Sequence, residues 1–332
     1  MEKKLRKVVP YVLGIFFLLT ITLFIVGTFK DLEISHALYH PDHLFGKAMS
    51  FLAPLPSCFF MGAVGAFVFR IFNKKNGLLN KIFGYLVLIV FQVVAFILYG
   101  KDGVDEAINN LILSFVIAFF IQVGIVIFIF YFSKKSKEED LIRATWCILL
   151  SMIFVLLTVI ILKEIFNRPR PFLIFEYGDQ YFTPWYSVID LPKEIVETAP
   201  SSYFGSFPSG HTSYSALVLL VPVFLSLNEK TKNYQSLSVF IGVAWIMLTM
   251  FSRMLLGNHF LTDVTFSAML GIIFTTFFQY FVKDLGKDNE KEMYPFKTTD
   301  YQIVKRYKAE RLLIEKSKKR PLLRAKNRIN KD

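Results

Sequence analysis

The sequence is poor in charge and nearly devoid of cysteine. Only 19% of its 332 residues are charged, against about 25% in a typical soluble protein. The two cysteines, Cys58 and Cys147, both lie in apolar stretches, so no disulfide framework or metal-binding spacing is present. Apolar and polar residues do not alternate as they do in barrel strands. No small-residue cleavage site follows the apolar run 11–29, so we interpret this run as a retained span rather than a secretory signal.

Long apolar runs separated by short charged connectors dominate the chain, and 54% of the residues are hydrophobic. A helix needs roughly 20 apolar residues to cross the hydrocarbon core of a bilayer. The sequence therefore predicts an all-α integral membrane protein with about eight transmembrane helices. They are expected near 8–29, 51–72, 82–99, 109–133, 141–162, 211–227, 235–251 and 263–282.

Lysine and arginine are distributed unevenly over the connectors. With the N-terminus inside, thirty of the 38 fall on the inner side, sixteen of them in the tail from Lys283. Cytoplasmic loops of membrane proteins carry such an excess, so both termini are expected in the cytoplasm. The net charge of +12 then favours a cytoplasmic tail, and no nucleic-acid partner is expected.

Three short motifs stand at ends of spans that this topology places on the outer face. The first is Lys163 followed by Arg170–Pro171, and the second is Pro208–Ser209–Gly210–His211. The third runs from Ser252–Arg253 through His259 to Asp263. Taken singly, such residues are more often interfacial anchors, helix caps or structural hydrogen-bonding pairs. Their joint occurrence on one face points to a site.

Together these motifs contain the groups that phosphoryl transfer requires. Lys163, Arg170 and Arg253 are cations suited to phosphate oxygens. The backbone N–H groups of Ser209 and Gly210, at the expected start of a helix, favour an anion. His259 and Asp263 are four residues apart and so share a helix face, where the carboxylate can fix the imidazole tautomer.

The pattern Lys-x6-Arg-Pro, Pro-Ser-Gly-His, Ser-Arg-x5-His-x3-Asp resembles the type 2 phosphatidic acid phosphatases. Their relatives include undecaprenyl-diphosphate phosphatases, phosphatidylglycerophosphate phosphatases and glucose-6-phosphatase. The resemblance implies that His259 is the nucleophile, Asp263 orients it and His211 protonates the leaving group. It also implies phosphate binding by Lys163, Arg170, Ser209, Gly210 and Arg253.

The resemblance also implies a domain organisation. A six-helix phosphatase core would occupy 82–282, preceded by an additional transmembrane hairpin at 1–81 and followed by a basic cytoplasmic tail at 283–332. The motifs themselves extend from Lys163 to Asp263, about a third of the chain. The resemblance leaves the N-terminal hairpin and the tail unexplained.

We therefore expect a lipid phosphatase of the cell membrane with its active site on the outer face. Phosphatidate, phosphatidylglycerophosphate and undecaprenyl diphosphate are the candidate substrates, hydrolysed through a phosphohistidine without a metal or other cofactor. The alternatives are a lipid phosphotransferase with the same intermediate, a vanadate-dependent haloperoxidase and a non-catalytic lipid-binding protein. The sequence does not predict the oligomeric state. Its Lys, Ile, Asn and Phe content is typical of AT-rich bacterial genomes.

Several residues lie outside the motifs. We expect Arg168 to be a solvated or headgroup-facing neighbour of Arg170. We expect His36, His40 and His43 to lie in a solvated loop, since Pro41 interrupts any helix there. A metal site is the alternative for these three histidines. Gln92 and Gln122, inside two apolar runs, are expected to form hydrogen bonds between helices. The aromatic segment 164–207 either lies on the outer leaflet, where it shapes lipid entry, or is an ordinary loop.

Overall fold

The structure is a computed structural model that describes residues 2–187 and 193–292. The chain divides into two compact units, Met1–Val282 and Lys283–Asp332. The first unit contains every element discussed below. In the second unit, residues 283–292 continue a helix, and the rest of the expected basic tail lies outside the described residues. The expected division of the first unit at residue 81 stays a prediction.

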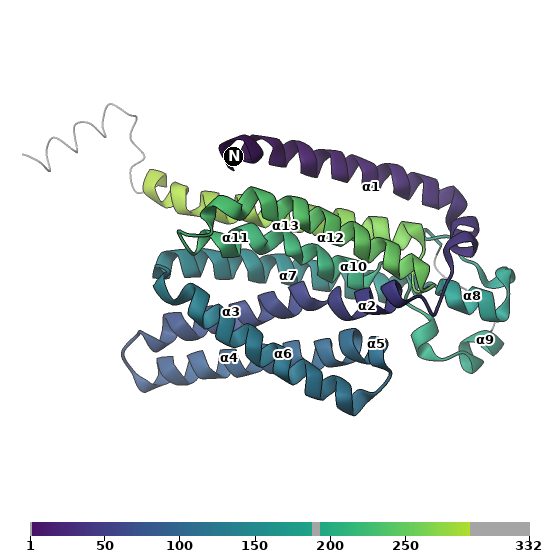
Figure 1. The fold of residues 1–332 in the computed structure, drawn as a ribbon, viewed down its shortest axis with the longest axis horizontal. Coiled ribbons are helices and arrows are strands. Elements are labelled where there is room, and N and C mark those ends of the chain that lie inside the picture. Colours follow the sequence, from purple (N-terminus) through teal and green to yellow (C-terminus); the bar gives the residue numbers. More distant parts are fainter. Residues whose placement is uncertain (1, 188–192, 293–332) are drawn as a thin grey trace, which may run out of the picture. The chain divides into compact units, whose positions relative to one another are not determined.

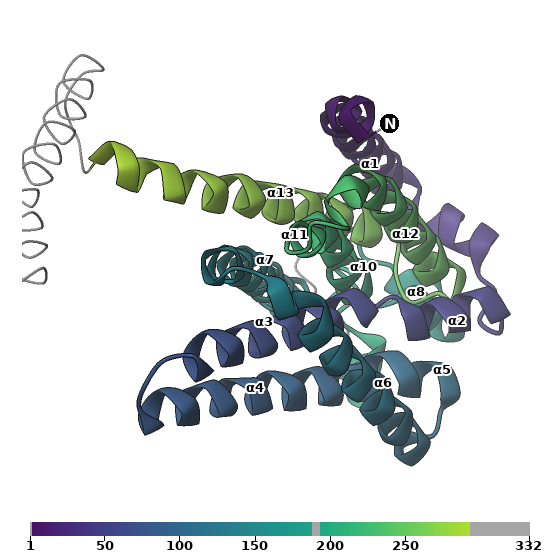
Figure 2. The same ribbon diagram turned by 60° about the vertical axis from the view of Figure 1, so that its left-hand side comes forward.

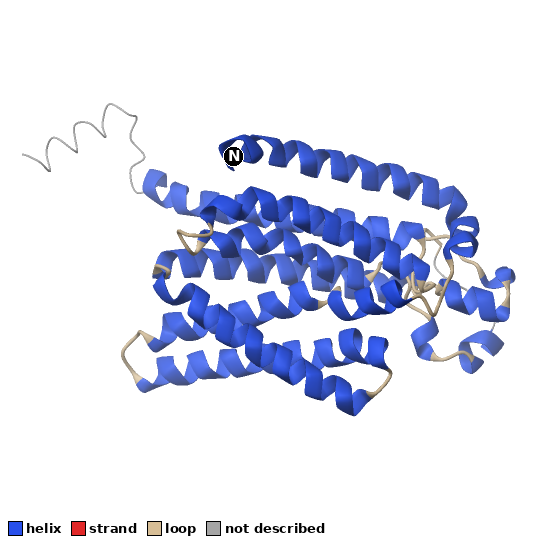
Figure 3. Cartoon of the chain, in the orientation of Figure 1, coloured by secondary structure: helices blue, strands red, loops and turns tan. Residues whose placement is uncertain are grey.

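The described residues form helices and connecting loops, without strands (Figure 3). The longer helices are α1 (Glu2–Leu38), α3 (Leu55–Asn73), α4 (Leu78–Leu98), α6 (Leu111–Phe132), α7 (Glu138–Phe166), α12 (Gln235–Leu255) and α13 (Leu261–Glu292). The shorter ones are α2 (Leu44–Leu52), α5 (Glu106–Ile108), α8 (Pro171–Tyr177), α9 (Lys193–Thr198), α10 (Gly210–Ser215) and α11 (Val221–Ser226). A π-helical segment, Tyr99–Asp105, joins α4 to α5.

Seven helical segments in the described part of the chain are long and apolar enough to cross a membrane. The chain is therefore an all-α protein suited to a bilayer, as the sequence predicts. The expected span 211–227 is an apolar helix too short to join these seven. It is broken into α10, a 3₁₀ segment at Ala216–Leu220, and α11. Pro222 lacks a backbone N–H, which explains why a regular α-helical hydrogen-bond ladder is lost at this point.

The first helix is longer than expected. The sequence predicts an outer loop from about residue 30, whereas α1 continues to Leu38. Residues 30–38 contain neither glycine nor proline, and Lys30 forms an ion pair with Glu33 one turn later, at 2.8 Å. The extra turns place Asp31 on a helix rather than in a loop. His40 and His43 do lie in the following loop, where His43 caps α2.

The helices of the first unit lie side by side, with α1 on one flank and the α3–α4 pair on the other (Figures 1 and 2). Helix α1 packs against α12, while α3 packs against α4, α6 and α7. Buried phenylalanines fill the core between α3, α7 and α11, including Phe60, Phe67 and Phe224. Gln122 donates to Gln92 at 2.5 Å, and Gln92 donates to the carbonyl of Gly62 at 3.2 Å. This confirms the expected interhelical hydrogen bonds.

The described residues of segment 164–207 form short helices and turns rather than an open loop. The segment contains α8 and α9, which lie beyond one end of the long helices (Figure 1). Its apolar residues form a small core of their own with Phe260, and Trp185 donates to the hydroxyl of Thr28 on α1 at 3.1 Å. Tyr186 is exposed. The proposed role of this segment in lipid entry stays a prediction.

Candidate functional site

The three sequence motifs come from the ends of different helices that meet at one end of the first unit. Lys163 lies in the last turn of α7, and His211 lies in the first turn of α10. Arg253 lies in the last turn of α12, His259 in the loop that follows, and Asp263 in the first turn of α13. Figure 1 shows these helix ends on the side of α2 and α8.

His259 is buried, and a backbone carbonyl determines its tautomer. Its Nδ1 lies 2.7 Å from the carbonyl oxygen of Ser206. A carbonyl only accepts hydrogen bonds, so Nδ1 carries the proton and Nε2 keeps its lone pair. Burial lowers the pKa of His259 to about 3, and the positive charges of Arg170 and Lys163 act in the same direction against the opposing effect of Asp263. The imidazole is therefore neutral at physiological pH.

Asp263 lies close to His259, although its carboxylate is not the nearest partner of the ring. Its Oδ2 lies 3.7 Å from His259 Nδ1. The same oxygen accepts from Ser206 Oγ at 2.5 Å and from the Phe260 N–H at 2.8 Å. The second contact satisfies a backbone donor at the start of α13, as a carboxylate at the third helical position does in a capping box. Asp263 thus forms hydrogen bonds to Ser206 and to the start of α13, on either side of His259.

Two of the three expected phosphate-binding cations form hydrogen bonds with the segment 204–206 or with the loop before His259. Lys163 donates to the carbonyl of Gly205. Arg170 donates to the carbonyl of Phe204 at 3.3 Å and to Asn258 at 3.4 Å. These contacts bring the first motif to the peptide next to the His259 ring.

The third cation, Arg253, is fully buried. Its Nη1 donates to Ser50 on α2 at 2.7 Å. Its Nε–H has no hydrogen-bond acceptor among the described residues, which leaves a buried donor available at this site. Buried polar groups are nearly always paired in proteins, so such a donor is typical of a ligand-binding position.

The Pro-Ser-Gly-His motif forms the start of α10. Ser209 is its N-cap, accepting from the N–H of Thr212 at 3.4 Å, and its own N–H donates to the Asp263 carbonyl at 3.3 Å. A methyl group on Gly210 would lie 3.9 Å from the Lys163 side chain. The second motif is therefore in contact with both the first and the third.

Glu106 is a residue of this site that the sequence did not reveal. Its carboxylate lies 2.6 Å from Arg253 Nη2, 3.2 Å from His211 Nε2 and 3.1 Å from Asn258 Nδ2. It follows the π-helical segment 99–105, and such segments are frequent at functional sites. An acidic residue just beyond an apolar run was the only available signal, because these three partners of Glu106 are more than a hundred residues away.

Arg168 corrects a sequence-based expectation. We expected it to face solvent or headgroups, but it is 1% exposed and forms ion pairs with Asp31 and Asp263. Helix α7 ends at Phe166. The next residue, Asn167, has a left-handed φ of +36°, and Arg168 follows this change of direction into the interior. A buried guanidinium needs paired carboxylates, and two are present.

His36, His40 and His43 do not form a metal site in the described part of the chain. Within residues 2–187 and 193–292, no group of three or more His, Cys, Asp or Glu side chains is arranged to hold a metal ion. His36 pairs with Asp179 at 3.0 Å, and His43 accepts from the N–H of Phe45. Each of these two histidines therefore has a partner of another kind.

Comparison with known proteins now connects this geometry to a family. Residues 144–287 match the PAP2 superfamily. The match covers 144 of the 332 residues of the chain. The matched segment contains all eight candidate site residues but neither Asp31 nor Glu106. No solved structure matches the chain.

One curated relative gives a more specific likeness. The chain is 25% identical over 140 residues to phosphatidylglycerophosphatase B of Haemophilus influenzae. The alignment covers 36% of this chain and 58% of that relative. The relative is thus matched over less than two thirds of its length, in a chain with additional helices before its PAP2 segment.

Proposed function

We propose that this protein is an integral membrane phosphatase that hydrolyses the phosphomonoester or diphosphate of a lipid through a phosphohistidine. The observation that carries the proposal is the buried His259, whose Nδ1–H is held by the Ser206 carbonyl so that Nε2 retains a lone pair. The match of residues 144–287 to the PAP2 superfamily and the name of the relative support the reaction class.

In the first step, the Nε2 lone pair of His259 attacks phosphorus opposite the leaving oxygen. The Nε2–P bond forms as the P–O bond to the lipid breaks, and protonated His211 gives its proton to the departing oxygen. The ring gains positive charge during this step. Asp263, 3.7 Å from Nδ1, stabilises that charge.

In the second step, water attacks the phosphohistidine. His211, now neutral, takes a proton from the water, the Nε2–P bond breaks, and inorganic phosphate leaves. Lys163, Arg170 and Arg253 stabilise the charge on the phosphoryl oxygens in both steps, together with Ser209 and Gly210. The proposal assigns no metal or other cofactor to this chemistry.

We place the active site on the outer face of the cell membrane and both termini in the cytoplasm. The site lies at one end of the first unit, and the loops that join α3 to α4 and α6 to α7 lie at the other (Figure 1). Those loops carry Lys74, Lys75, Lys134 and Lys135. Basic loops of this kind favour the cytoplasmic side.

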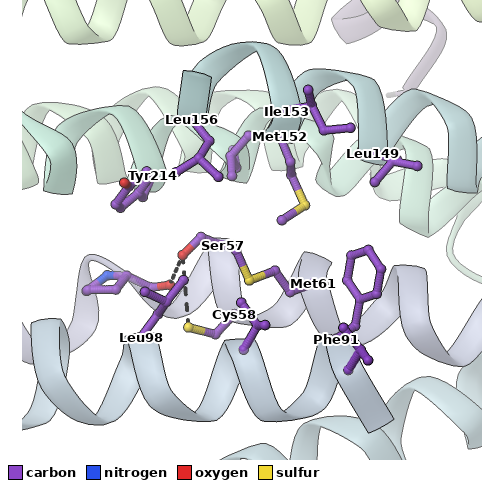
Figure 4. A pocket seen from close by; sticks show the side chains of 14 residues that line it. Ser57, Cys58, Met61, Phe91, Leu98, Leu149, Met152, Ile153, Leu156 and Tyr214 are labelled. Atoms are coloured by element: carbon purple, nitrogen blue, oxygen red, sulfur yellow. Dashed lines mark hydrogen bonds between the residues drawn. The ribbon is translucent and has the colours of Figure 1, made fainter. Parts of the chain in front are cut away.

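An apolar cavity supports a substrate with a hydrocarbon chain. It measures about 290 Å³ and lies between α3, α4, α7 and the start of the α10 segment. Figure 4 shows Met152 of α7 pointing toward Met61 of α3 across it. Tyr214, which also lines the cavity, is three residues after His211 and so lies one helical turn away from it. A lipid tail in this cavity would direct its phosphate toward His211.

Filling the cavity should therefore select against long lipid tails. We expect Met152→Trp to raise KM for a long-chain lipid phosphate about tenfold, because the larger side chain displaces apolar substrate surface. KM for a short-chain, soluble phosphate ester should change less than about twofold. Phosphate-release kinetics on purified protein would measure both.

A matched control lies on the same helix. Ile161 is 53% exposed on α7, away from the cavity, so Ile161→Trp should leave both KM values unchanged. Equal increases for the long and the short substrate in Met152→Trp would show that the cavity does not hold the tail.

Glu106 lies between Arg253 and His211, the position that the proposed mechanism assigns to the phosphoryl group. An anionic substrate must therefore displace the Glu106 carboxylate. The apparent affinity for anions is then the intrinsic affinity multiplied by the fraction of molecules in which the carboxylate has moved away. The π-helical segment before Glu106 offers a short stretch of backbone that can adjust as the carboxylate moves.

Glu106→Gln should tighten the binding of tetrahedral anions, since it removes the competing charge and nearly preserves the side-chain shape. We expect the inhibition constant for orthovanadate to fall about tenfold, which corresponds to about 1.4 kcal/mol. Glu176, which accepts from Tyr203 on a neighbouring helix, supplies the control variant Glu176→Gln. Weaker vanadate inhibition in Glu106→Gln would mean that Glu106 assists anion binding instead.

The proposed function is tested by phosphate release from phosphatidate, phosphatidylglycerophosphate and undecaprenyl diphosphate, each presented to the purified protein in mixed micelles. We expect release from at least one of the three. If none of them yields phosphate while a known lipid phosphatase releases it under the same conditions, the proposed function is wrong.

A further inference from the structure

Asp31 lies on α1, which precedes the PAP2-matched segment, and is nevertheless buried beside the candidate catalytic residues. Its side chain is 3% exposed. Its Oδ2 lies 3.0 Å from Arg168 Nη2, and its Oδ1 accepts from the Thr262 N–H at 3.0 Å. The Thr262 hydroxyl also donates to Oδ2. A carboxylate near a membrane is costly to bury unless it is paired, so this position has a specific role.

Arg168 connects Asp31 to Asp263. Its Nη2 contacts Asp31, and its Nη1 lies 2.6 Å from Asp263 Oδ1. Its remaining contacts hold the guanidinium in place: Nε donates to the Thr183 carbonyl at 2.8 Å, and the group lies 4.0 Å from the centre of the Phe260 ring. The chain Asp31–Arg168–Asp263 is thus a continuous row of buried charges that ends beside His259.

Asp31 also acts on the backbone next to His259. Thr262 is the second residue of α13, and its N–H has no helical acceptor at a helix start. Asp31 supplies that acceptor from a different helix. Gly27 permits the approach, because a methyl group there would lie 3.1 Å from the Thr262 nitrogen. Asp31 thereby fixes the start of α13, which carries Asp263.

We infer that Asp31 is a positioning residue for the phosphoryl transfer, acting on His259 through Arg168 and Asp263. This inference rests on the proposed function. Arg168 shared between two carboxylates neutralises Asp263 less than Arg168 paired with Asp263 alone. With Asp31 present, the net electrostatic potential at His259 is therefore more negative, which stabilises the imidazole as it becomes positive during attack. The inference also gives the first N-terminal helix a function in catalysis.

The test compares Asp31→Asn with the control Glu33→Gln in the full-length protein. Glu33 lies two residues further along α1, and its side chain is 60% exposed. Rapid-quench kinetics measure the rate constant of phosphohistidine formation, and the amplitude of the burst counts the active sites. We expect Asp31→Asn to lower the rate constant at least about tenfold, by analogy with the loss of residues that support a metal-ligating histidine. Glu33→Gln should leave it unchanged.

A second measurement does not depend on turnover. In protein labelled with ¹⁵N-histidine, His259 should show the Nδ1-protonated tautomer in the unmodified chain and in Glu33→Gln. Asp31→Asn should produce a mixture of tautomers or a shifted Nδ1 resonance, because Asp263 and the start of α13 lose their support. His259→Ala identifies the resonance among the five histidines.

The outcomes separate the possible failures. If Asp31→Asn lowers only the burst amplitude, with an unchanged rate constant and tautomer, Asp31 is merely structural and the inference is overturned. The same holds if neither measurement changes. If the unmodified chain forms no phosphohistidine but Asp31→Asn still alters the His259 resonance, the proposed mechanism fails while the positioning role stands.

Discussion

Replacing His259 with alanine is expected to lower phosphate release by more than about a thousandfold, because the substitution removes the proposed nucleophile. The backbone carbonyl of Ser206 holds the ring at Nδ1, and in the proposed mechanism Nε2 is the atom that attacks. The remaining cations can still bind phosphate. The variant should therefore lose turnover while retaining inhibitor binding, which a vanadate-protection assay and a phosphate-release assay measure together.

A second histidine serves as the control. His36 also lies near a carboxylate, Asp179, but its side chain is 48% exposed and distant in sequence from the motifs. His36→Ala should retain nearly full activity. Labelled substrate and acid-labile phosphohistidine analysis should find the phosphoryl group on His259 in the unmodified chain. Substantial hydrolysis by His259→Ala would end the proposed mechanism.

Replacing Arg168 with methionine is expected to destabilise the protein by about 3–5 kcal/mol, the typical effect of removing one partner from a buried ion pair. The loss is large because two carboxylates, Asp31 and Asp263, then remain buried without their shared cation. Methionine fills much of the same volume, so a cavity contributes little to the effect. Denaturant unfolding in detergent, followed by tryptophan fluorescence, would measure the free energy of unfolding.

The comparison for Arg168→Met is Lys30→Met, which breaks an ion pair whose side chains are both 60% exposed. Exposed pairs of this kind contribute about 0–1 kcal/mol, so this variant should unfold nearly as the unmodified protein does. Adding Asp31→Asn to Arg168→Met should recover part of the lost stability, because one fewer carboxylate is left unpaired. An Arg168→Met variant as stable as the parent would show that the row of buried charges does not stabilise the fold.

The helices were predictable because each apolar run is a local property of the chain. A membrane-spanning helix satisfies its own backbone hydrogen bonds, so about 20 apolar residues are enough to specify one. The hydrogen bonds between Gln92 and Gln122 were predictable for the same reason, since a polar side chain inside an apolar run needs a partner. The end of α1 and the break in the expected span 211–227 were not predictable. Apolar content does not indicate where a helix bends or continues.

The candidate site was predictable in its residue types but not in its connections. The motifs suggested that Asp263 holds His259 directly, whereas the Ser206 carbonyl is the closer partner and Asp263 holds Ser206 as well. Every residue has a backbone carbonyl, so a sequence motif does not show which carbonyl contacts the His259 ring. Glu106 and Asp31 belong to helices outside the three motifs. No residue near them in the sequence indicates which distant residues they contact.

By itself the sequence determined that the chain forms apolar helices and carries the residue types of a phosphoryl-transfer site. The tertiary structure alone decided that Arg168 is buried, that Asp31 pairs with it across 137 residues, and that Glu106 lies against Arg253. Helix formation depends on neighbours a few residues apart, which the sequence displays. Pairing of buried charges depends on which helix ends meet in space, and only the packed chain specifies that.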